Sequence, residues 1–360
     1  MTSTSVRIEA VSKRFGEVTA VDRVDLSVAK GEFFTLLGSS GCGKTTLLRI
    51  VAGFMPQSDG RILFGDACID AVPAHRRNTG MVFQNYAIFP HLTVVENIAY
   101  GLRARGLAAG EINERVGRML AMMRLEHLGH RRPRELSGGQ QQRVVLARAI
   151  VIEPDVLLMD EPLSNLDTEM RVHLRGEIRA LQRQIGITTL YVTHDQEEAL
   201  MMSDRVAVMS GGRVEQVGTP AEIFHRPRTR FVAAFIGETN FLPATRLGAG
   251  GNDTALYDVP GGGRLAVPSG QASAAGSPAE VAFRSHDLIV GPATESGWTA
   301  TVTDTQFYGA TVRLVLELAP NVFAQAALTG AAAQTLPPPG SRVGLSLHSQ
   351  SPWIFPAKPQ

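Results

Sequence analysis

The chain contains the stretch Gly38-Ser39-Ser40-Gly41-Cys42-Gly43-Lys44-Thr45-Thr46, which fits the pattern G-x-x-x-x-G-K-[ST]. An apolar run of strand length, 32–37, precedes it, and a helical pattern, 46–52, follows it and ends at Gly53. Glycines allow backbone N–H groups to turn inward around phosphate oxygens, and the positive end of the following helix points at the same place. The stretch therefore predicts a phosphate-binding loop between a strand and a helix.

Two side chains of this loop have a predicted task. Lys44 is expected to reach the β- and γ-phosphates of a nucleotide, and the hydroxyl of Thr45 is expected to ligate Mg²⁺. A chance match in a glycine-rich turn is the alternative, and the flanking strand and helix argue against it.

Composition limits the remaining possibilities. The chain has 360 residues, of which 44% are apolar, so two or three domains with sizeable cores are expected. A net charge of +1 does not indicate binding to nucleic acid or an anionic membrane. Two cysteines, Cys42 and Cys68, form no disulfide framework and favour a reducing cytosol. No signal peptide pattern and no apolar run of about 18 residues is present, so any membrane role is expected to come through partners.

The first two-thirds of the chain predict an α/β fold with two additions. Alternating residues in 5–30 predict antiparallel strands, and 86–152 reads as mostly helical, with a capping box at Thr93 and Glu96. Apolar strands and helices then alternate, as in a parallel sheet covered on both faces. The predicted elements are strands at 156–159, 188–192 and 205–209, and helices at 168–185 and from Asp195 and Thr219, where Asp195 and Glu198 resemble a capping box.

Beyond Gly237 the composition changes to short β-like runs separated by glycines, with strand candidates at 298–302, 311–316 and 343–347. Such spacing is typical of an all-β barrel. The predicted fold class is thus an α/β P-loop NTPase core with antiparallel β and helical subdomains over 1–236, followed by an all-β, OB-like barrel domain over 237–360.

A second stretch, Leu136-Ser137-Gly138-Gly139-Gln140, completes a resemblance to the ATP-binding cassette family, whose signature is LSGGQ. The resemblance covers residues 5 to 236 and includes the family's sequence marks in order. These are Phe15 at the aromatic A-loop position, Gly38 to Thr45 as Walker A, Gln84 in the Q-loop, Asp160 and Glu161 after the Walker B strand, Asp167 in the D-loop, and His194 as the switch histidine.

The resemblance implies a role for each mark. Phe15 would stack on adenine, Asp160 would hold Mg²⁺ through water, and Glu161 would be the base that activates the attacking water. Gln84 would contact Mg²⁺ or that water, and His194 would contact the γ-phosphate. Taken singly, Phe15 could be a core aromatic, His194 a capping or packing residue, Gln84 an inert surface residue, and the acidic pair a helix cap.

The signature also implies a second chain. Ser137-Gly138-Gly139 at a helix N-terminus is an anion site, while the phosphate loop already holds the phosphates within one chain. In the family, two cassettes pack head to tail, and ATP binding closes a homodimer that hydrolysis reopens. The predicted nucleotide contacts are Phe15, Gly38, Ser39, Ser40, Gly41, Cys42, Gly43, Lys44, Thr45, Thr46, Ser137, Gly138, Gly139, Gln140 and Asp167.

Within this family the chain resembles an importer ATPase. It has one cassette and no membrane span, and its tail resembles the regulatory domain of maltose-, polyamine- and ferric-iron-type members. The segment 237–242 resembles the corresponding segment of polyamine members. The segment 85–91 resembles both polyamine and iron members, and it has Phe89 where sugar members usually carry Tyr. One departure is Arg284-Ser285-His286, where the family commonly has Arg-Pro-Glu.

We therefore expect an ATPase on the cytoplasmic face of the inner membrane, a homodimer bound to two integral-membrane permeases and served indirectly by a periplasmic or extracellular solute-binding protein. Polyamine is the first substrate candidate, followed by ferric iron, phosphonate, sulfate or sugar. A cassette ATPase acting on DNA or ribosomes is the competing class, but no coiled-coil insertion, second cassette or basic tract supports it. An inactive regulatory protein conflicts with the presence of Lys44, Asp160 and Glu161.

Overall fold

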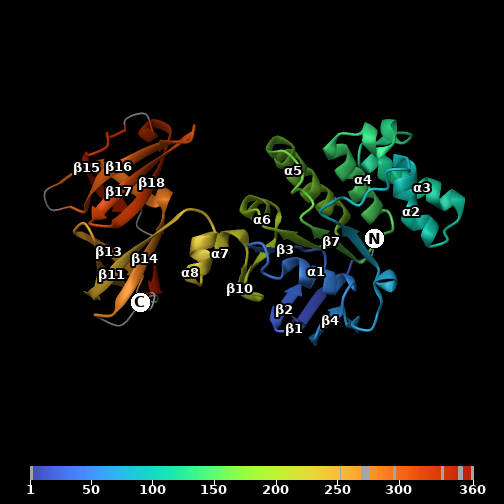
Figure 1. The fold of residues 1–360 in the computed structure, drawn as a ribbon, viewed down its shortest axis with the longest axis horizontal. Coiled ribbons are helices and arrows are strands. Elements are labelled where there is room, and N and C mark those ends of the chain that lie inside the picture. Colours follow the sequence, from blue (N-terminus) through green and yellow to red (C-terminus); the bar gives the residue numbers. More distant parts are fainter. Residues whose placement is uncertain are drawn as a thin grey trace. The chain divides into compact units, whose positions relative to one another are not determined.

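The computed structural model describes residues 3–251, 253–268, 276–294, 297–333, 336–347 and 352–357. The chain divides into two compact units, Met1–Arg226 and Pro227–Gln360 (Figure 1). The sequence pattern places the domain boundary between 236 and 237. In the structure, the short helix α8 (Arg230–Phe235) belongs to the second unit.

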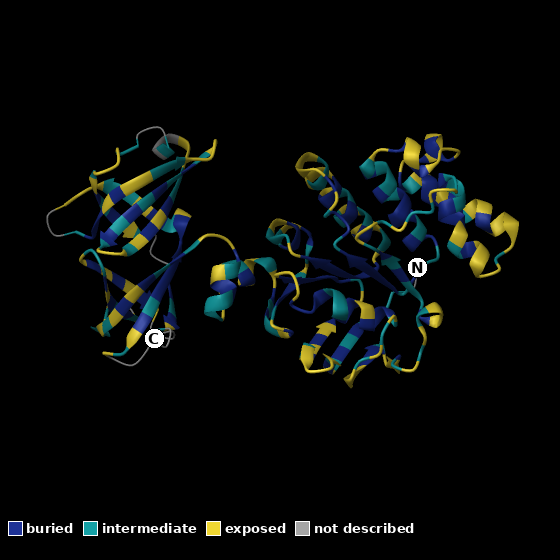
Figure 2. Cartoon of the chain, in the orientation of Figure 1, coloured by how far each residue is buried: buried dark blue, intermediate teal, exposed yellow. Residues whose placement is uncertain are grey.

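A six-stranded sheet forms the centre of the first unit, in the order β10-β9-β3-β8-β7-β6. Every residue of β3, β7 and β8 is buried, as a parallel sheet covered on both faces requires, and these strands are dark blue in Figure 2. Only β10 runs antiparallel to its neighbour. The strands are β3 (Phe33–Gly38), β6 (Thr79–Val82), β7 (Val156–Asp160), β8 (Thr188–Thr193), β9 (Arg205–Ser210) and β10 (Arg213–Gly218).

The predicted N-terminal antiparallel strands form a second sheet, in the order β2-β1-β4-β5. Helix α1 (Lys44–Ala52) follows β3 directly and ends at Gly53, whose φ is 81°. The buried Arg77 donates to the carbonyls of Ile50 and Val51 at 2.8 Å and so satisfies the C-terminal end of α1. The strands are β1 (Val6–Phe15), β2 (Val18–Val28), β4 (Asp59–Phe64) and β5 (Ala67–Cys68).

The helical region contains α2 (Val94–Ala104), α3 (Ala109–Met122) and α4 (Gly138–Ile150). The capping box of Thr93 and Glu96 is present. Residues 86–92 form a loop before this cap, in which Tyr86 and Ala87 have positive φ. Pro90 disfavours a helix there, and the buried Asn97 side chain binds backbone groups of the loop instead.

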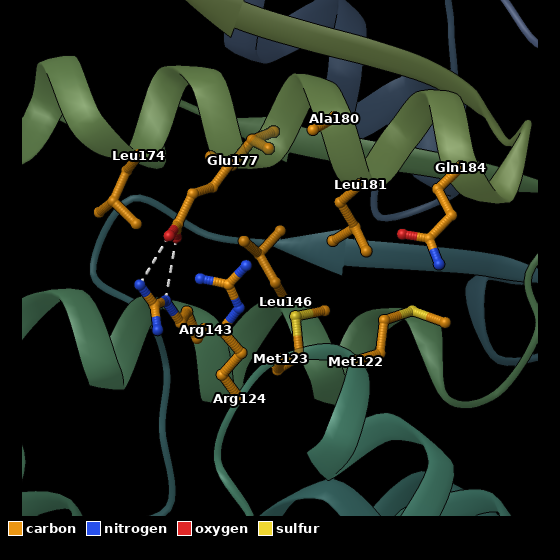
Figure 3. A pocket seen from close by; sticks show the side chains of 11 residues that line it. Met122, Met123, Arg124, Arg143, Leu146, Leu174, Glu177, Ala180, Leu181 and Gln184 are labelled. Carbon is orange, nitrogen blue, oxygen red and sulfur yellow. Dashed lines mark hydrogen bonds and ion pairs between the residues drawn. The ribbon is translucent and has the colours of Figure 1, made fainter.

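Buried residues of helix α5 (Thr168–Ile185) share one apolar core with the helical region and the central sheet. A groove of about 170 Å³ lies between α4 and α5, and an ion pair of Arg143 with Glu177 at 2.7 Å crosses it. Figure 3 shows the side chains that line it. Methionine and leucine side chains line much of this groove, and none of the predicted site residues does.

Two shorter helices complete the first unit, α6 (Gln196–Met202) and α7 (Pro220–His225). Asp195 caps α6 as predicted, but Glu198 does not close a capping box. It is buried and accepts hydrogen bonds from Tyr191 and Thr193 instead. Within the described residues, no helix has the length and apolar character needed to cross a membrane. Short 3-10 helices of this unit are Ala74–Arg76, Glu126–Leu128 and Pro133–Glu135.

The second unit confirms the predicted all-β domain. It contains two five-stranded antiparallel sheets, β13-β12-β11-β14-β20 and β15-β19-β16-β17-β18, which share one apolar core. Buried residues alternate with exposed or partly exposed ones along β12 and β13. The strands are β11 (Thr239–Ala249), β12 (Thr254–Val259), β13 (Gly263–Pro268), β14 (Pro278–Arg284), β15 (Leu288–Pro292), β16 (Thr299–Phe307), β17 (Thr311–Ala319), β18 (Val322–Thr329), β19 (Arg342–Leu347) and β20 (Trp353–Pro356), with 3-10 turns at Ser285–Asp287 and Gly330–Ala333.

The unusual Arg284-Ser285-His286 segment has a structural task at the end of β14. The buried guanidinium of Arg284 donates to the carbonyl of Ala233 at 2.9 Å and stacks on Trp353 at 5.0 Å. Burial lowers the pKa of Arg284 to about 10. Ser285 binds Glu238 through its backbone N–H at 3.1 Å. The segment thus ties β14 to helix α8.

Candidate functional site

The predicted catalytic residues follow the carboxyl ends of four neighbouring parallel strands, β3, β8, β7 and β6. The register pairs Leu37 with Thr193, and Asp160 with Val192, so these strand ends are level. Ligands of open α/β sheets bind beyond this edge. The structure therefore brings the phosphate loop, Gln84, Asp160, Glu161 and His194 to one edge of the sheet.

The phosphate loop has the backbone that the glycine pattern predicts. Gly41 and Gly43 have φ of 80° and 99°, a region that side chains disfavour. A Cβ atom on Gly43 would also lie 2.3 Å from the carbonyl oxygen of Ala20 on β2. Lys44 is buried, and its ammonium donates to the carbonyls of Gly38 at 2.8 Å and Ser39 at 2.9 Å. The positive charge is thus placed within the loop itself.

Oxygen ligands of the kind that Mg²⁺ prefers lie beside this loop. The hydroxyl of Thr45 donates to Asp160 Oδ1 at 2.8 Å. Burial raises the pKa of Asp160, although the hydrogen bond from Thr45 acts to lower it. A bound cation would favour the charged form of this carboxylate. No group of three or more His, Cys, Asp or Glu that could hold a metal ion occurs in the described part of the chain. These residues fit a Mg²⁺ held by one or two protein oxygens together with phosphates and water.

Glu161 and His194 form a pair directly after β7 and β8. A ring nitrogen of His194 lies 2.9 Å from Glu161 Oε2. Glu161 has φ of 44°, which is uncommon for a residue with a side chain. Its backbone is fixed on both sides, since its N–H donates to Val192 and its carbonyl accepts from the Ser164 hydroxyl at 3.0 Å each. His194 can thus orient the Glu161 carboxylate, which is able to accept a proton.

Gln84 lies in an exposed turn after β6 and is tied to the segment that follows Glu161. The side chain of Asn165 donates to the carbonyl oxygen of Gln84 at 2.8 Å. This link was not predicted, although Asn165 stands in the D-loop pattern. It joins the Q-loop and the D-loop within one chain.

The signature residues form the start of α4. Ser137 Oγ accepts from the N–H of Gln140 at 3.3 Å, and the Gln140 side chain accepts from the N–H of Ser137 at 3.0 Å. A Cβ on Gly139 would lie 2.9 Å from the sulfur of Met170, so glycine allows close packing on α5. Between described residues, no hydrogen bond or ion pair joins Ser137 to the loop of Lys44.

Asp167 and Phe15 are also placed by the structure. Asp167 caps α5 by accepting from the N–H of Met170 at 2.9 Å. Phe15 is the last residue of β1 and is 50% exposed, which does not fit a core aromatic. The Lys13 ammonium lies 5.2 Å from the centre of its ring. Phe15 thus offers an accessible flat face.

The loop after Gln84 is fixed by two side chains that sequence reasoning missed. Asn97 accepts from the N–H of Phe89 at 2.9 Å and donates to its carbonyl at 3.1 Å. Arg148 donates to the carbonyl of Ala87 at 2.8 Å, and its guanidinium lies 4.8 Å from the centre of the Phe89 ring. A buried Asn and an Arg on separate helices give no signal in a linear pattern.

Comparison with known proteins identifies the family of the chain. The family model described as ABC transporter matches residues 21–164, and that described as TOBE domain matches residues 281–355. A spermidine/putrescine import ATP-binding protein, PotA of Rubrobacter xylanophilus, is 48% identical over 314 residues, covering 87% of this chain and 83% of that protein. An Fe(3+) ions import ATP-binding protein, FbpC of Rhizobium etli, is 45% identical over 312 residues, covering 87% of each.

A solved structure is also similar to the first unit. It is a dimeric, post-hydrolysis ATP-binding cassette bound to ADP and Pi, 29% identical, with a TM-score of 0.53. The match covers 60% of this chain and 98% of that one. Together with the identities to full-length relatives, these findings confirm the predicted family. The chain belongs to the ABC transporter family, within the group of import ATP-binding proteins that carry a TOBE domain.

Proposed function

We propose that this chain hydrolyses ATP to drive the uptake of a polyamine, spermidine or putrescine, through two partner permeases. The observation that carries the hydrolytic part is the 2.9 Å contact of Glu161 with His194, beside the loop of Lys44. Relatives named for spermidine/putrescine import, 45% to 56% identical, support the substrate.

Each site residue has a task in this proposal. Lys44 and the loop N–H groups bind the β- and γ-phosphates, replacing the carbonyl partners that Lys44 has in this structure. Thr45 and Asp160, with Gln84, would hold Mg²⁺, whose charge would offset that of the phosphates. Phe15 stacks on the adenine ring.

Glu161 is the proposed general base. Its carboxylate accepts a proton from water as the water oxygen attacks the γ-phosphorus. The bond from that phosphorus to the oxygen bridging it to the β-phosphate breaks, and ADP and phosphate leave. His194 keeps Glu161 oriented and donates to a γ-phosphate oxygen.

A homodimer completes the site. Among the described residues of one chain, no hydrogen bond or ion pair joins Ser137, at the N-terminus of α4, to the loop of Lys44. The signature is therefore available to cap ATP bound by a second chain. The likeness to a solved dimeric cassette supports this arrangement. We place Asp167 and its helix at the same interface. The dimer works at the cytoplasmic face of the membrane, with the permeases and an external solute-binding protein.

Ferric iron is the second substrate candidate. Relatives named for Fe(3+) import are 45% and 52% identical to this chain, which is close to the polyamine group. The cassette resides on the other side of the membrane from the solute, so the solute-binding protein is the component to examine.

The test is reconstitution of the chain in proteoliposomes with the permeases and solute-binding protein encoded beside it. We expect ATPase activity to be stimulated by the binding protein loaded with spermidine or putrescine, and abolished by Lys44→Ala. Stimulation by the Fe³⁺-loaded protein alone would contradict the substrate proposal. Absence of ATP hydrolysis by the wild-type complex would contradict the enzymatic proposal.

A further inference from the structure

The turn that carries His194 is fixed by buried charges from helix α5. Arg175 is only 4% exposed and donates through its two terminal nitrogens, to Asp195 Oδ2 at 2.8 Å and to Glu197 Oε2 at 2.9 Å. Arg171, four residues earlier on α5, lies 3.6 Å from the same Asp195 oxygen. His194 therefore directly precedes a carboxylate that α5 holds in place.

The chain on both sides of His194 is fixed as well. Thr193 Oγ1 accepts from the N–H of Asp195 at 3.0 Å and donates to Glu198 Oε2 at 2.7 Å. Tyr191 donates to the same Glu198 oxygen at 2.8 Å. Asp195 Oδ1 meanwhile accepts two N–H groups of the first turn of α6. The backbone beside His194 is thus held through both Asp195 and Glu198.

Arg175 is held in this network by the surrounding carboxylates, which favour its charged form. Burial disfavours its charged form, but the hydrogen bond to Glu197 and the charges of Asp195, Glu198 and Glu197 outweigh burial, so the pKa of Arg175 is raised. Arg175 is thus a cation, and its removal takes from Asp195 the nearer of its two arginine partners and from the exposed Glu197 its arginine partner. Such a loss displaces the groups involved or costs stability.

We propose that Arg175 is a positioning residue for ATP hydrolysis. It locks the His194 turn to α5, so that the His194 ring keeps its contact with Glu161. Helix α5 begins at its cap Asp167 and carries Arg175. A movement of the first turn of α5 is therefore passed along this helix to Arg175, and from Arg175 to the His194 turn. This inference rests on the roles proposed above for Glu161 and His194.

The kinetic test compares Arg175→Met with Arg179→Met. Arg179 lies one turn later on the same helix, is 12% exposed, pairs with Asp204 and stacks on Phe33. Among the described residues it makes no hydrogen bond or ion pair with residues 193–198, although the Phe33 ring contacts the Tyr191 ring at 5.5 Å. A misplaced catalytic group costs up to about a hundredfold in rate. We expect Arg175→Met to lower kcat by about ten- to a hundredfold, with little change in KM for ATP. The kcat of Arg175→Lys should lie between those of the wild type and Arg175→Met, because one ammonium cannot bridge both carboxylates. Arg179→Met should keep kcat per folded molecule.

A spectroscopic test does not depend on turnover. The His194 ring signal in a histidine NMR spectrum is identified as the one absent from His194→Ala. We expect Arg175→Met to move this signal at constant pH, and Arg179→Met to leave it in place. If Arg175→Met does not fold, Glu197→Ala serves instead, because Glu197 is 77% exposed and its truncation removes one arm of the bridge.

The outcomes separate this inference from the proposed function. An unmoved His194 signal in the folded Arg175 or Glu197 variant, or equal kcat in the Arg175 and Arg179 variants, would overturn the inference. A His194→Ala chain with wild-type turnover would instead overturn the role proposed for His194. A slow His194→Ala chain beside an unimpaired Arg175→Met chain overturns only the positioning role.

Discussion

Glu161 and His194 come from the ends of two neighbouring strands and meet at 2.9 Å. They are separated by a helix and a strand in the sequence, and the level register of β7 and β8 brings them together. The Glu161 backbone is held at positive φ by contacts on both sides. The site thus has a carboxylate whose position depends on the sheet rather than on a loose loop.

The first prediction concerns this carboxylate. Glu161→Gln keeps the side-chain shape but removes the proton acceptor, so we expect the hydrolysis rate to fall by about a hundredfold or more. ATP should still bind and should hold a stable dimer, measured by size-exclusion chromatography with ATP. Glu126→Gln, at an exposed position in the 3-10 helix Glu126–Leu128, is the matched control. Near wild-type hydrolysis by Glu161→Gln would contradict the general-base role.

The second prediction concerns stability around α1. Arg77 is buried, and besides Ile50 and Val51 it donates to the carbonyls of Val72 and Ile69. Arg77→Met leaves the carbonyls of Val51 and Val72 without this donor, while those of Ile50 and Ile69 keep the N–H groups of Gly53 and Val72. We therefore expect the free energy of unfolding to fall by about 3 kcal/mol. Thermal and urea unfolding measure the change.

The neighbouring Arg76 is exposed and provides the control for Arg77. Arg76→Met should unfold within about 0.5 kcal/mol of the wild type. Equal stability of the two variants would show that the carbonyls capped by Arg77 find other partners.

The third prediction concerns pH and Glu198. Burial raises the pKa of Glu198 above its ordinary 4.5, against hydrogen bonds from Thr193 and Tyr191. Folding therefore favours the protonated carboxyl, and this contribution to stability is complete below pH 4.5 and is lost as pH rises through the folded-state pKa. Relative to Glu198→Gln, which does not titrate, the wild type should lose unfolding free energy as pH rises. A pH-independent difference in urea unfolding would contradict this prediction.

The fourth prediction concerns a surface for the permeases. Phe89 follows the Q-loop and packs 4.5 Å from Tyr100, ring centre to ring centre, while Asn97 fixes its backbone. We expect Phe89→Glu to reduce solute transport in proteoliposomes while the isolated chain keeps its ATPase activity, because an apolar permease helix would meet a charge. Phe89→Tyr, which keeps the ring, should transport normally. Loss of both activities in Phe89→Glu would favour a packing role within the helical region.

Local patterns were sufficient for much of the fold. The glycine loop, the buried strands 156–159 and 188–192 and the cap at Thr93 were predicted because each is set by neighbours in sequence, and the structure confirms them. The side chains that hold the loop at 86–92 could not be predicted, since its contact with Asn97 depends on tertiary packing. Asn165 and Arg175 were missed for the same reason, because a link between distant elements has no periodic signal.

The central claim is that each ATP lies between the loop of Lys44 in one chain and Ser137 of the other. Cysteines at Ser39 and Ser137, both exposed, test it in a chain with Cys42→Ser, Cys68→Ser and Glu161→Gln, in which bound ATP persists. We predict an oxidative cross-link between chains that forms with Mg²⁺ and ATP and is absent without nucleotide or with Lys44→Ala added. A cross-link found only within one chain, or one between chains that forms equally without ATP, would contradict the shared site.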